Sequence, residues 1–227
     1  MYEAVFLSDI HFGIMQNEAL ILEFLRELKT KKLILAGDVI SFSVKDTTPN
    51  LDTFFNIIKS QDWELIYILG NHEKESLNFE KFANYFKDIN ILNEYSIDIN
   101  GNKIHIEHGD NFHYKDPINK AIKHFMLKSK LKTYKKSSKK FKSKRNLYYK
   151  IKPLIKKILY KSYINYIKKE AIKRGANIAI CGHLHEPEIK QLSNVKYINC
   201  GDWIKNCSYV TLNSNGVLEL KYYKQKG

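Results

Sequence analysis

The stretch "CGHLHEP", Cys181–Pro187, follows the apolar run "NIAI" and places two histidines two positions apart behind a glycine. A short apolar run that ends at glycine is typical of a buried strand followed by a bend. His183 and His185 therefore stand at a strand end, where a buried imidazole needs a polar partner. The same arrangement recurs along the chain, and the recurrence predicts both the fold and the chemistry.

Other short apolar runs also end in polar clusters. These clusters are Ser8-Asp9-Ile10-His11, Gly37-Asp38, Gly70-Asn71-His72-Glu73, His108-Gly109-Asp110 and Gly201-Asp202-Trp203. Amphipathic helical stripes lie between the first runs, within residues 20–28, 51–58 and 79–86, the first with Asn17 as its expected cap. Alternating strands and helices predict a layered α/β domain, and residues 209–212 and 218–221 around "NSNG" predict a hairpin.

The strand ends supply a set of polar side chains that we expect to gather at one edge of the sheet, because ligands bind beyond the carboxyl ends of strands in open α/β sheets. The set comprises Asp9, His11, Asp38, Asn71, His72, His108, His183 and His185. Burying so many ionisable groups together without a cation would cost several kcal/mol each. Any one cluster alone is equally typical of a turn, a helix cap or a core histidine, so it is the recurrence that indicates a site for Mn²⁺, Fe²⁺ or Zn²⁺.

The ordered pattern Asp9-x-His11, Gly37-Asp38, Gly70-Asn71-His72-Glu73, His108 and Gly182-His183-x-His185 resembles the calcineurin-like metallophosphoesterases. The resemblance implies a four-layer α/β/β/α sandwich and two divalent metal ions, of which Mn²⁺ is the first choice and Fe²⁺ or Zn²⁺ the alternatives. It implies one ion bound by Asp9, His11 and His185, a second bound by Asn71, His108 and His183, and Asp38 between them. His72 would protonate the leaving oxygen or stabilise charge on the phosphoryl group, and a hydroxide acidified by the two cations would be the nucleophile.

Four further residues are expected around the site: Glu73, Asp110, Asp202 and Trp203. Glu73 either orients His72 or a metal ligand, or is a solvated loop acid. Asp110 either supports the metal-bound ring of His108 or caps a turn. The Asp202-Trp203 segment is expected beside the site, where Trp203 stacks on a nucleoside or covers the site unless it belongs to the core.

Residues 113–174 interrupt the alternation of strands and helices, so we expect a catalytic core at 1–112 and 175–227 with a helical cap inserted between. Helical patterns at 118–126, 151–159 and 163–171 flank a charged segment, 128–145, that is expected to be a loop. The chain carries a net charge of +14, but Lys128–Arg174 alone carries +18, so the remainder is slightly acidic. Any electrostatic partner is therefore expected at the lysine-rich cap.

The substrate is suggested by two longer segments, "HGDNF" around His108 and "YINCGDWIKNCSYV" near the end of the chain. Together with the insertion they resemble the UDP-2,3-diacylglucosamine pyrophosphohydrolases of lipid A synthesis, which release the lipid monophosphate and UMP. The best-studied form of that branch has arginine-aspartate where this chain has His72-Glu73. A second form keeps the histidine, and this chain is similar to that one.

Three interpretations of the basic cap stay open. Residues 118–174 could bind an anionic membrane surface together with a phosphorylated or nucleotide-linked lipid. They could instead pack onto the core with their lysines solvated. In the third, the lysines neutralise nucleic-acid phosphates while Tyr134, Phe141, Tyr148 and Tyr149 stack on bases. The corresponding rival functions are a phosphodiesterase or phosphatase acting on nucleotides or nucleic acid, and a non-catalytic scaffold that binds membrane or protein.

Composition narrows the cellular context. No apolar run approaches the roughly 18 residues of a spanning helix, and the beginning "MYEAVFLSDIH" lacks the features of a signal peptide. Cys181, Cys200 and Cys207 lack metal-type spacing and are expected to be reduced thiols. We therefore expect a cytoplasmic protein, peripheral on the cytoplasmic face of the inner membrane if the cap binds lipid.

Overall fold

The computed structural model describes residues 1–14, 18–41, 50–74, 83–117, 119–120 and 140–223. The chain divides into two compact units, one formed by Met1–Gly109 with Ala171–Gly227 and the other by Asp110–Glu170.

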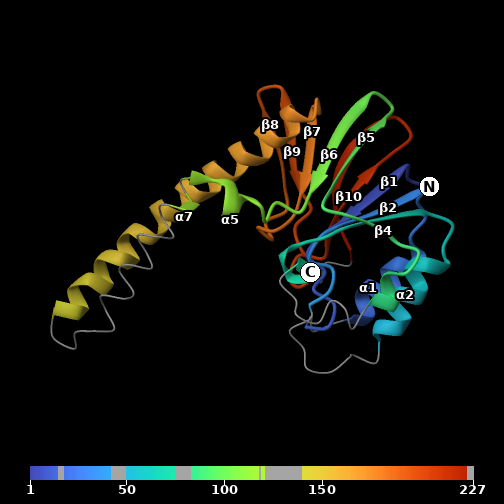
Figure 1. Ribbon diagram of the computed structural model, residues 1–227, viewed down its shortest axis with the longest axis horizontal. Helices are drawn as coiled ribbons and strands as arrows, with labels where there is room; N and C mark the ends of the chain where they lie inside the picture. Colours follow the sequence, from blue (N-terminus) through green and yellow to red (C-terminus); the bar gives the residue numbers. More distant parts are fainter. Residues whose placement is uncertain (15–17, 42–49, 75–82, 118, 121–139, 224–227) are drawn as a thin grey trace. The chain divides into compact units, whose positions relative to one another are not determined.

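The first unit contains two β-sheets (Figure 1). One sheet consists of β1 (Ala4–Leu7), β2 (Lys32–Ala36), β3 (Glu64–Ile68), β4 (Asn90–Leu92), β10 (Ser208–Leu212) and β11 (Leu218–Tyr222), in the order β11-β10-β1-β2-β3-β4. The other consists of β5 (Glu94–Ile99), β6 (Asn102–Glu107), β7 (Ile178–Cys181), β8 (Glu188–Leu192) and β9 (Val195–Asn199), in the order β5-β6-β7-β9-β8.

The strands that precede the polar clusters are parallel within each sheet. β1 to β4 pair in parallel, and so do β6, β7 and β9. Their carboxyl ends therefore meet at one edge of each sheet. The strands predicted before the polar clusters and the β10–β11 hairpin are confirmed, whereas β4, β5 and β8 were not predicted.

The two sheets enclose a layer of buried apolar side chains. It includes Phe6, Ile34, Ile66, Ile104, Ile106, Ile180 and Ile198. Because alternate residues of a strand face opposite sides, Leu7, Leu33 and Leu35 belong to a second layer. There they pack with α1 (Glu18–Glu27) and α2 (Leu51–Ser60), which lie side by side next to β1 and β2 in Figure 1. The expected α/β fold with two packed sheets and helices is confirmed.

The second unit contains α5 (Phe112–Lys115) and most of the long α7 (Lys140–Lys173). The helices predicted separately at 151–159 and 163–171 form this one helix, and Pro153 lies inside it without dividing it. The prediction of a loop at 128–145 is wrong for residues 140–145, which are helical. The rest of that segment and nearly all of the helix predicted at 118–126 lie outside the described residues. Within this unit Ser162 donates a hydrogen bond to Asp116, and the Phe112 ring packs against Tyr163.

Two shorter helices complete the description: α3 (Asn71–Lys74) and α4 (Ala83–Phe86). The helix predicted within residues 79–86 is described only as α4, and the expected cap Asn17 lies outside the described residues. Among the helices of the described ranges, none has an apolar stretch long enough to cross a bilayer.

We predict that Ile106→Ala, which empties space between the sheets, lowers the free energy of unfolding by about 2–5 kcal/mol. Val217→Ala is the control because Val217 is 48% exposed, and it should change stability by less than about 0.5 kcal/mol. Chemical denaturation of both variants measures the difference. Equal effects would show that the layer between the sheets is not close-packed.

Candidate metal centre

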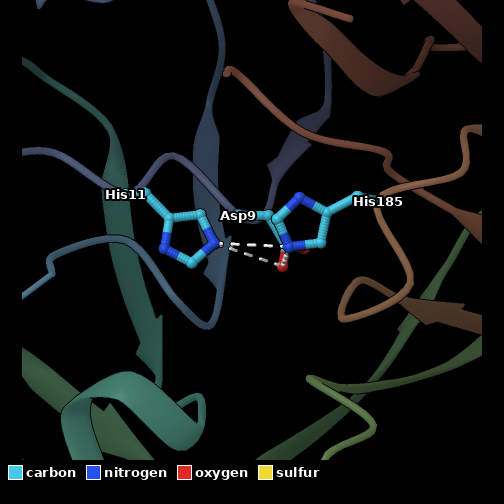
Figure 2. Close-up of side chains that lie close together, drawn as sticks. All are labelled: Asp9, His11 and His185. Atoms are coloured by element: carbon cyan, nitrogen blue, oxygen red, sulfur yellow. Dashed lines mark hydrogen bonds and ion pairs between the residues drawn. The ribbon is translucent and has the colours of Figure 1, made fainter. Parts of the chain in front are cut away.

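Three side chains from the ends of β1 and β7 converge on one point. Asp9 and His11 follow β1, and His185 follows β7. The Nε2 atom of His185 lies 3.0 Å from Oδ1 of Asp9, and the Nε2 atoms of His11 and His185 lie 3.3 Å apart. Figure 2 shows the two rings and the carboxylate turned toward one another. The three side chains each offer one donor atom, and these atoms lie close enough together to hold a metal ion.

A second group lies at the ends of β2, β6 and β7. Asp38, His108 and His183 each offer an atom within 4.8 Å of the others. Nε2 of His108 is 3.2 Å from Asp38, and its Nδ1 is 3.0 Å from the carbonyl oxygen of Ala36. Because a carbonyl only accepts, Nδ1 carries a proton and donates to Ala36, and Nε2 is the ring nitrogen that faces Asp38.

Asp38 connects the two groups, since it also gathers with His11 and His72. Its Oδ1 accepts a hydrogen bond from the backbone N–H of His72, and its Oδ2 is 3.9 Å from Nε2 of that ring. The structure therefore brings together seven of the predicted residues through these groups: Asp9, His11, Asp38, His72, His108, His183 and His185.

The remaining predicted ligand, Asn71, opens α3 and is followed directly by His72. Its amide oxygen is buried and has no hydrogen-bond partner within the described part of the chain. An orphaned buried acceptor costs about 1–3 kcal/mol, which a cation coordinated by that oxygen would recover. Together with two buried carboxylates and several imidazoles, this oxygen makes a donor set that fits borderline divalent ions.

The electrostatics keep both carboxylates anionic. Burial alone raises the pKa of Asp38, but the neighbouring His108 and the His72 N–H more than offset it, so the pKa of Asp38 is lowered. The pKa of Asp9 is also lowered, because His108 and His185 outweigh the effect of its burial. The hydrogen bond to Asp9 raises the pKa of His185, whereas burial lowers the pKa of His11.

Five of these residues have a left-handed backbone. The φ angles are 51° at Asp9, 50° at His11, 50° at Asp38, 68° at His183 and 56° at His185. Such conformations cost about 1–3 kcal/mol each outside glycine and persist only where the surroundings enforce them. Here the enforcement includes backbone hydrogen bonds from Asp9 to Gly37 and from His11 to Asp38.

Position 182 requires glycine because Ser8 and Asp9 pass very close to its backbone. A Cβ atom there would lie 1.8 Å from Oγ of Ser8 and 2.2 Å from Oδ2 of Asp9. Gly37 is under the same constraint, since its Cβ would lie 2.5 Å from the His108 ring. The absence of a side chain at Gly182 and Gly37 therefore leaves space for Asp9 and His108.

Glu73 connects the segments that follow β2 and β3 through hydrogen bonds. It is 1% exposed, and its carboxylate accepts hydrogen bonds from the backbone N–H groups of Asp38 and Gly70. It also accepts from the N–H groups of Val39 and Ile40 and from the Tyr67 hydroxyl. Burial raises the pKa of Glu73, yet all its partners donate, so the arrangement accommodates the ionised form. Glu73 thus positions the backbone of a ligand and is not a solvated loop acid.

Asp202 lies against the opposite side of His185, with Oδ2 3.8 Å from Nδ1 of that ring. Trp203 is 1% exposed and packs against Phe24 in the core, so its ring is not available to stack on a nucleoside. Its backbone N–H donates to the carbonyl of Asp9. Asp110 belongs to the second unit, where it is buried and its carbonyl accepts from the N–H of His113.

Ser41 was missed by the sequence analysis. It is 3% exposed, and its hydroxyl lies 3.1 Å from Nδ1 of His72, whose side chain is 36% exposed. With Nδ1 held by Ser41, the Nε2 side of the ring faces the metal centre. Its only signal in the sequence is its position three residues after Asp38, and a loop serine is too common to stand out.

The buried carboxylates and imidazoles at the strand ends of the two sheets form groups that could hold metal ions. The chain belongs to the calcineurin-like phosphoesterase family, whose model matches residues 3–187, so it is a metal-dependent hydrolase of phosphoric esters.

Among relatives, the chain is 29% identical to the UDP-2,3-diacylglucosamine hydrolase of Wigglesworthia glossinidia brevipalpis, over 91% of this chain and 84% of that protein. Two solved structures share the fold at low identity. YfcE, a phosphoesterase from E. coli, has a TM-score of 0.54 at 16% identity, covering 97% of this chain and 93% of that one. Vacuolar protein sorting 29 from Cryptosporidium parvum has a TM-score of 0.51 at 12% identity, covering 96% and 94%.

We predict that Glu73→Gln lowers the free energy of unfolding by about 2–4 kcal/mol, because its NH₂ group must face backbone N–H donors in either orientation. Glu219→Gln removes an exposed carboxylate that pairs with Lys221, and it should cost less than about 1 kcal/mol. Denaturant unfolding compares the two. A stability of Glu73→Gln equal to that of the control would contradict the anchoring role.

We predict that Asp38→Ala reduces bound Mn²⁺ more than Asn71→Ala does, because Asp38 contributes to two donor groups. Elemental analysis after dialysis measures the metal-to-protein ratio, and His113→Ala, in the second unit, is the control. Wild-type metal content in Asp38→Ala would exclude that carboxylate as a ligand.

Proposed function

We propose that the protein is a pyrophosphohydrolase that uses two divalent cations, Mn²⁺ in first place, to cleave UDP-2,3-diacylglucosamine into the lipid monophosphate and UMP. The observation that carries the reaction class is the convergence of Asp9, His11 and His185 beside Asp38, His108 and His183. The choice of substrate is supported by the relative of that name, which aligns over most of both chains.

The cations would be held by these two groups with Asn71, and when bound they acidify water and neutralise charge on the phosphoryl group. The chain's own contribution centres on His72. When the ring is an imidazolium, Nδ1–H donates to the Ser41 hydroxyl oxygen and Nε2–H is directed toward Asp38. Nε2 can then give its proton to the oxygen of the leaving phosphate, and the ring is left neutral with its remaining proton on Nδ1. The His72 N–H fixes the orientation of the Asp38 carboxylate at the same time.

The described part of α7 supports a lipid substrate and an anionic membrane surface as its partners. Leu154 is 59% exposed and Ile158 is 40% exposed, and their spacing places them on the same face of the helix. Exposed Lys152, Lys157 and Lys161 flank them. An apolar stripe bordered by lysines binds at an anionic lipid surface, where each cation contributes about 1 kcal/mol. On this proposal the protein is peripheral on the cytoplasmic face of the inner membrane.

The nucleic-acid interpretation rested on Tyr134, Phe141, Tyr148 and Tyr149, whose side chains lie outside the described part of the chain. No observation in the described residues favours it over the lipid.

Turnover of a substrate panel by the Mn²⁺-loaded protein tests the proposal. We predict cleavage of UDP-2,3-diacylglucosamine to UMP, with a higher kcat/KM than for bis(p-nitrophenyl) phosphate and no cleavage of single-stranded DNA. His72→Asn should lower kcat by about 10²–10⁴-fold at unchanged metal content, because it removes the proton donor.

His113→Asn is the matched control, since it changes an exposed histidine of the second unit. Hydrolysis of the aryl ester alone would remove the lipid substrate from the proposal. Absence of turnover by metal-loaded protein would favour a non-catalytic scaffold.

A further inference from the structure

A cavity of about 460 Å³ opens beside the metal centre, entirely within the first unit. Its lining residues are Leu184, His185, Glu186, Pro187, Asp202, Ile204, Lys205 and Asn206. The volume lies in the range of small-molecule sites. His185 is shared: Nε2 of its ring faces Asp9, and Nδ1 faces Asp202. A group bound in the cavity would therefore lie next to a phosphoryl group at the metal centre.

The wall formed by residues 202–206 is held from inside by Asp202, which is 2% exposed. Its Oδ1 accepts from the backbone N–H groups of Lys205 and Asn206, at 2.6 and 3.2 Å. Its Oδ2 accepts from the Asn206 side-chain amide at 2.6 Å, and the same amide donates to the carbonyl of His185 at 3.1 Å. Asn206 thus connects the wall to the backbone of His185, and these hydrogen bonds do not involve the side chains of Ile204 and Lys205.

Those two side chains are presented to solvent. Ile204 is 47% exposed, and Lys205 is exposed. Within the described residues no carboxylate forms an ion pair with the Lys205 ammonium group. Five of the eight lining residues are polar or charged, a mixture that suits a nucleoside. Ile204 and Pro187 offer an aliphatic surface to a flat ring.

In a diphosphate substrate the second phosphate is one bridging oxygen away from the phosphorus under attack. A cation beside the metal centre can therefore bind that phosphate, and the group attached to it continues into the cavity. We infer that this cavity is the nucleotide subsite: Lys205 binds the phosphate of the UMP half, and Ile204 and Asn206 contact its nucleoside. The inference rests on the proposed function for the identity of the nucleotide.

Lys205→Met tests the subsite, because it removes the charge and keeps most of the aliphatic stem. The dissociation constant of UMP, measured by calorimetry on Mn²⁺-loaded protein, should rise about tenfold. In kinetics, the ratio of kcat/KM for UDP-2,3-diacylglucosamine to kcat/KM for bis(p-nitrophenyl) phosphate should fall by a similar factor. Lys103→Met is the matched control, since Lys103 is exposed near the start of β6, away from the strand ends that form the site.

Unchanged UMP affinity in Lys205→Met overturns the subsite, as does a loss of affinity for glucosamine 1-phosphate in place of UMP. Failure of the proposed function is a separate result: the wild-type protein would not cleave the lipid substrate. In that case Lys205-dependent binding of UMP would still support the nucleotide subsite.

Discussion

The burial of two carboxylates, Asp9 and Asp38, at the ends of neighbouring parallel strands is the constraint on which the rest of the site depends. An uncompensated buried carboxylate is too costly to be tolerated, so compensation must come from the surroundings. Part of it comes from the His183 and His72 N–H groups, which donate to these carboxylates. Neighbouring imidazoles supply a further part, and they lower the pKa of both carboxylates. The same carboxylates and imidazoles form groups that could hold metal ions, which is consistent with the phosphoesterase family to which the chain belongs.

Bringing donors 174 residues apart into contact has a cost in backbone conformation. Five predicted ligand residues have positive φ, and glycine at positions 37 and 182 leaves space for His108 and Asp9. Glu73 supplies the opposing stabilisation, because one buried carboxylate holds the loops after β2 and β3. The hydrophobic layers between the sheets and beside them stabilise the fold and offset the cost of these backbone conformations.

Much of this arrangement could be predicted from the sequence, because buried parallel strands are continuous apolar runs and their ends carry the ligands. The short edge strands β4 and β8 were missed because their residues are only partly buried and lack an apolar run. The contacts of Glu73 and Ser41 depend on how two loops meet in space, which no local pattern records. The burial of Trp203 in the core depends on its packing against Phe24, which its residue type does not reveal. Likewise, the residue type of Pro153 does not reveal that α7 continues through it.

Anomalous diffraction from crystals soaked in Mn²⁺ tests the central claim most directly, because it locates cations independently of turnover. The account predicts two peaks, one among Asp9, His11 and His185 and one among Asp38, His108 and His183. Density for these side chains in the same positions without a peak in either group would contradict it, and the chemistry assigned to the site would have no basis.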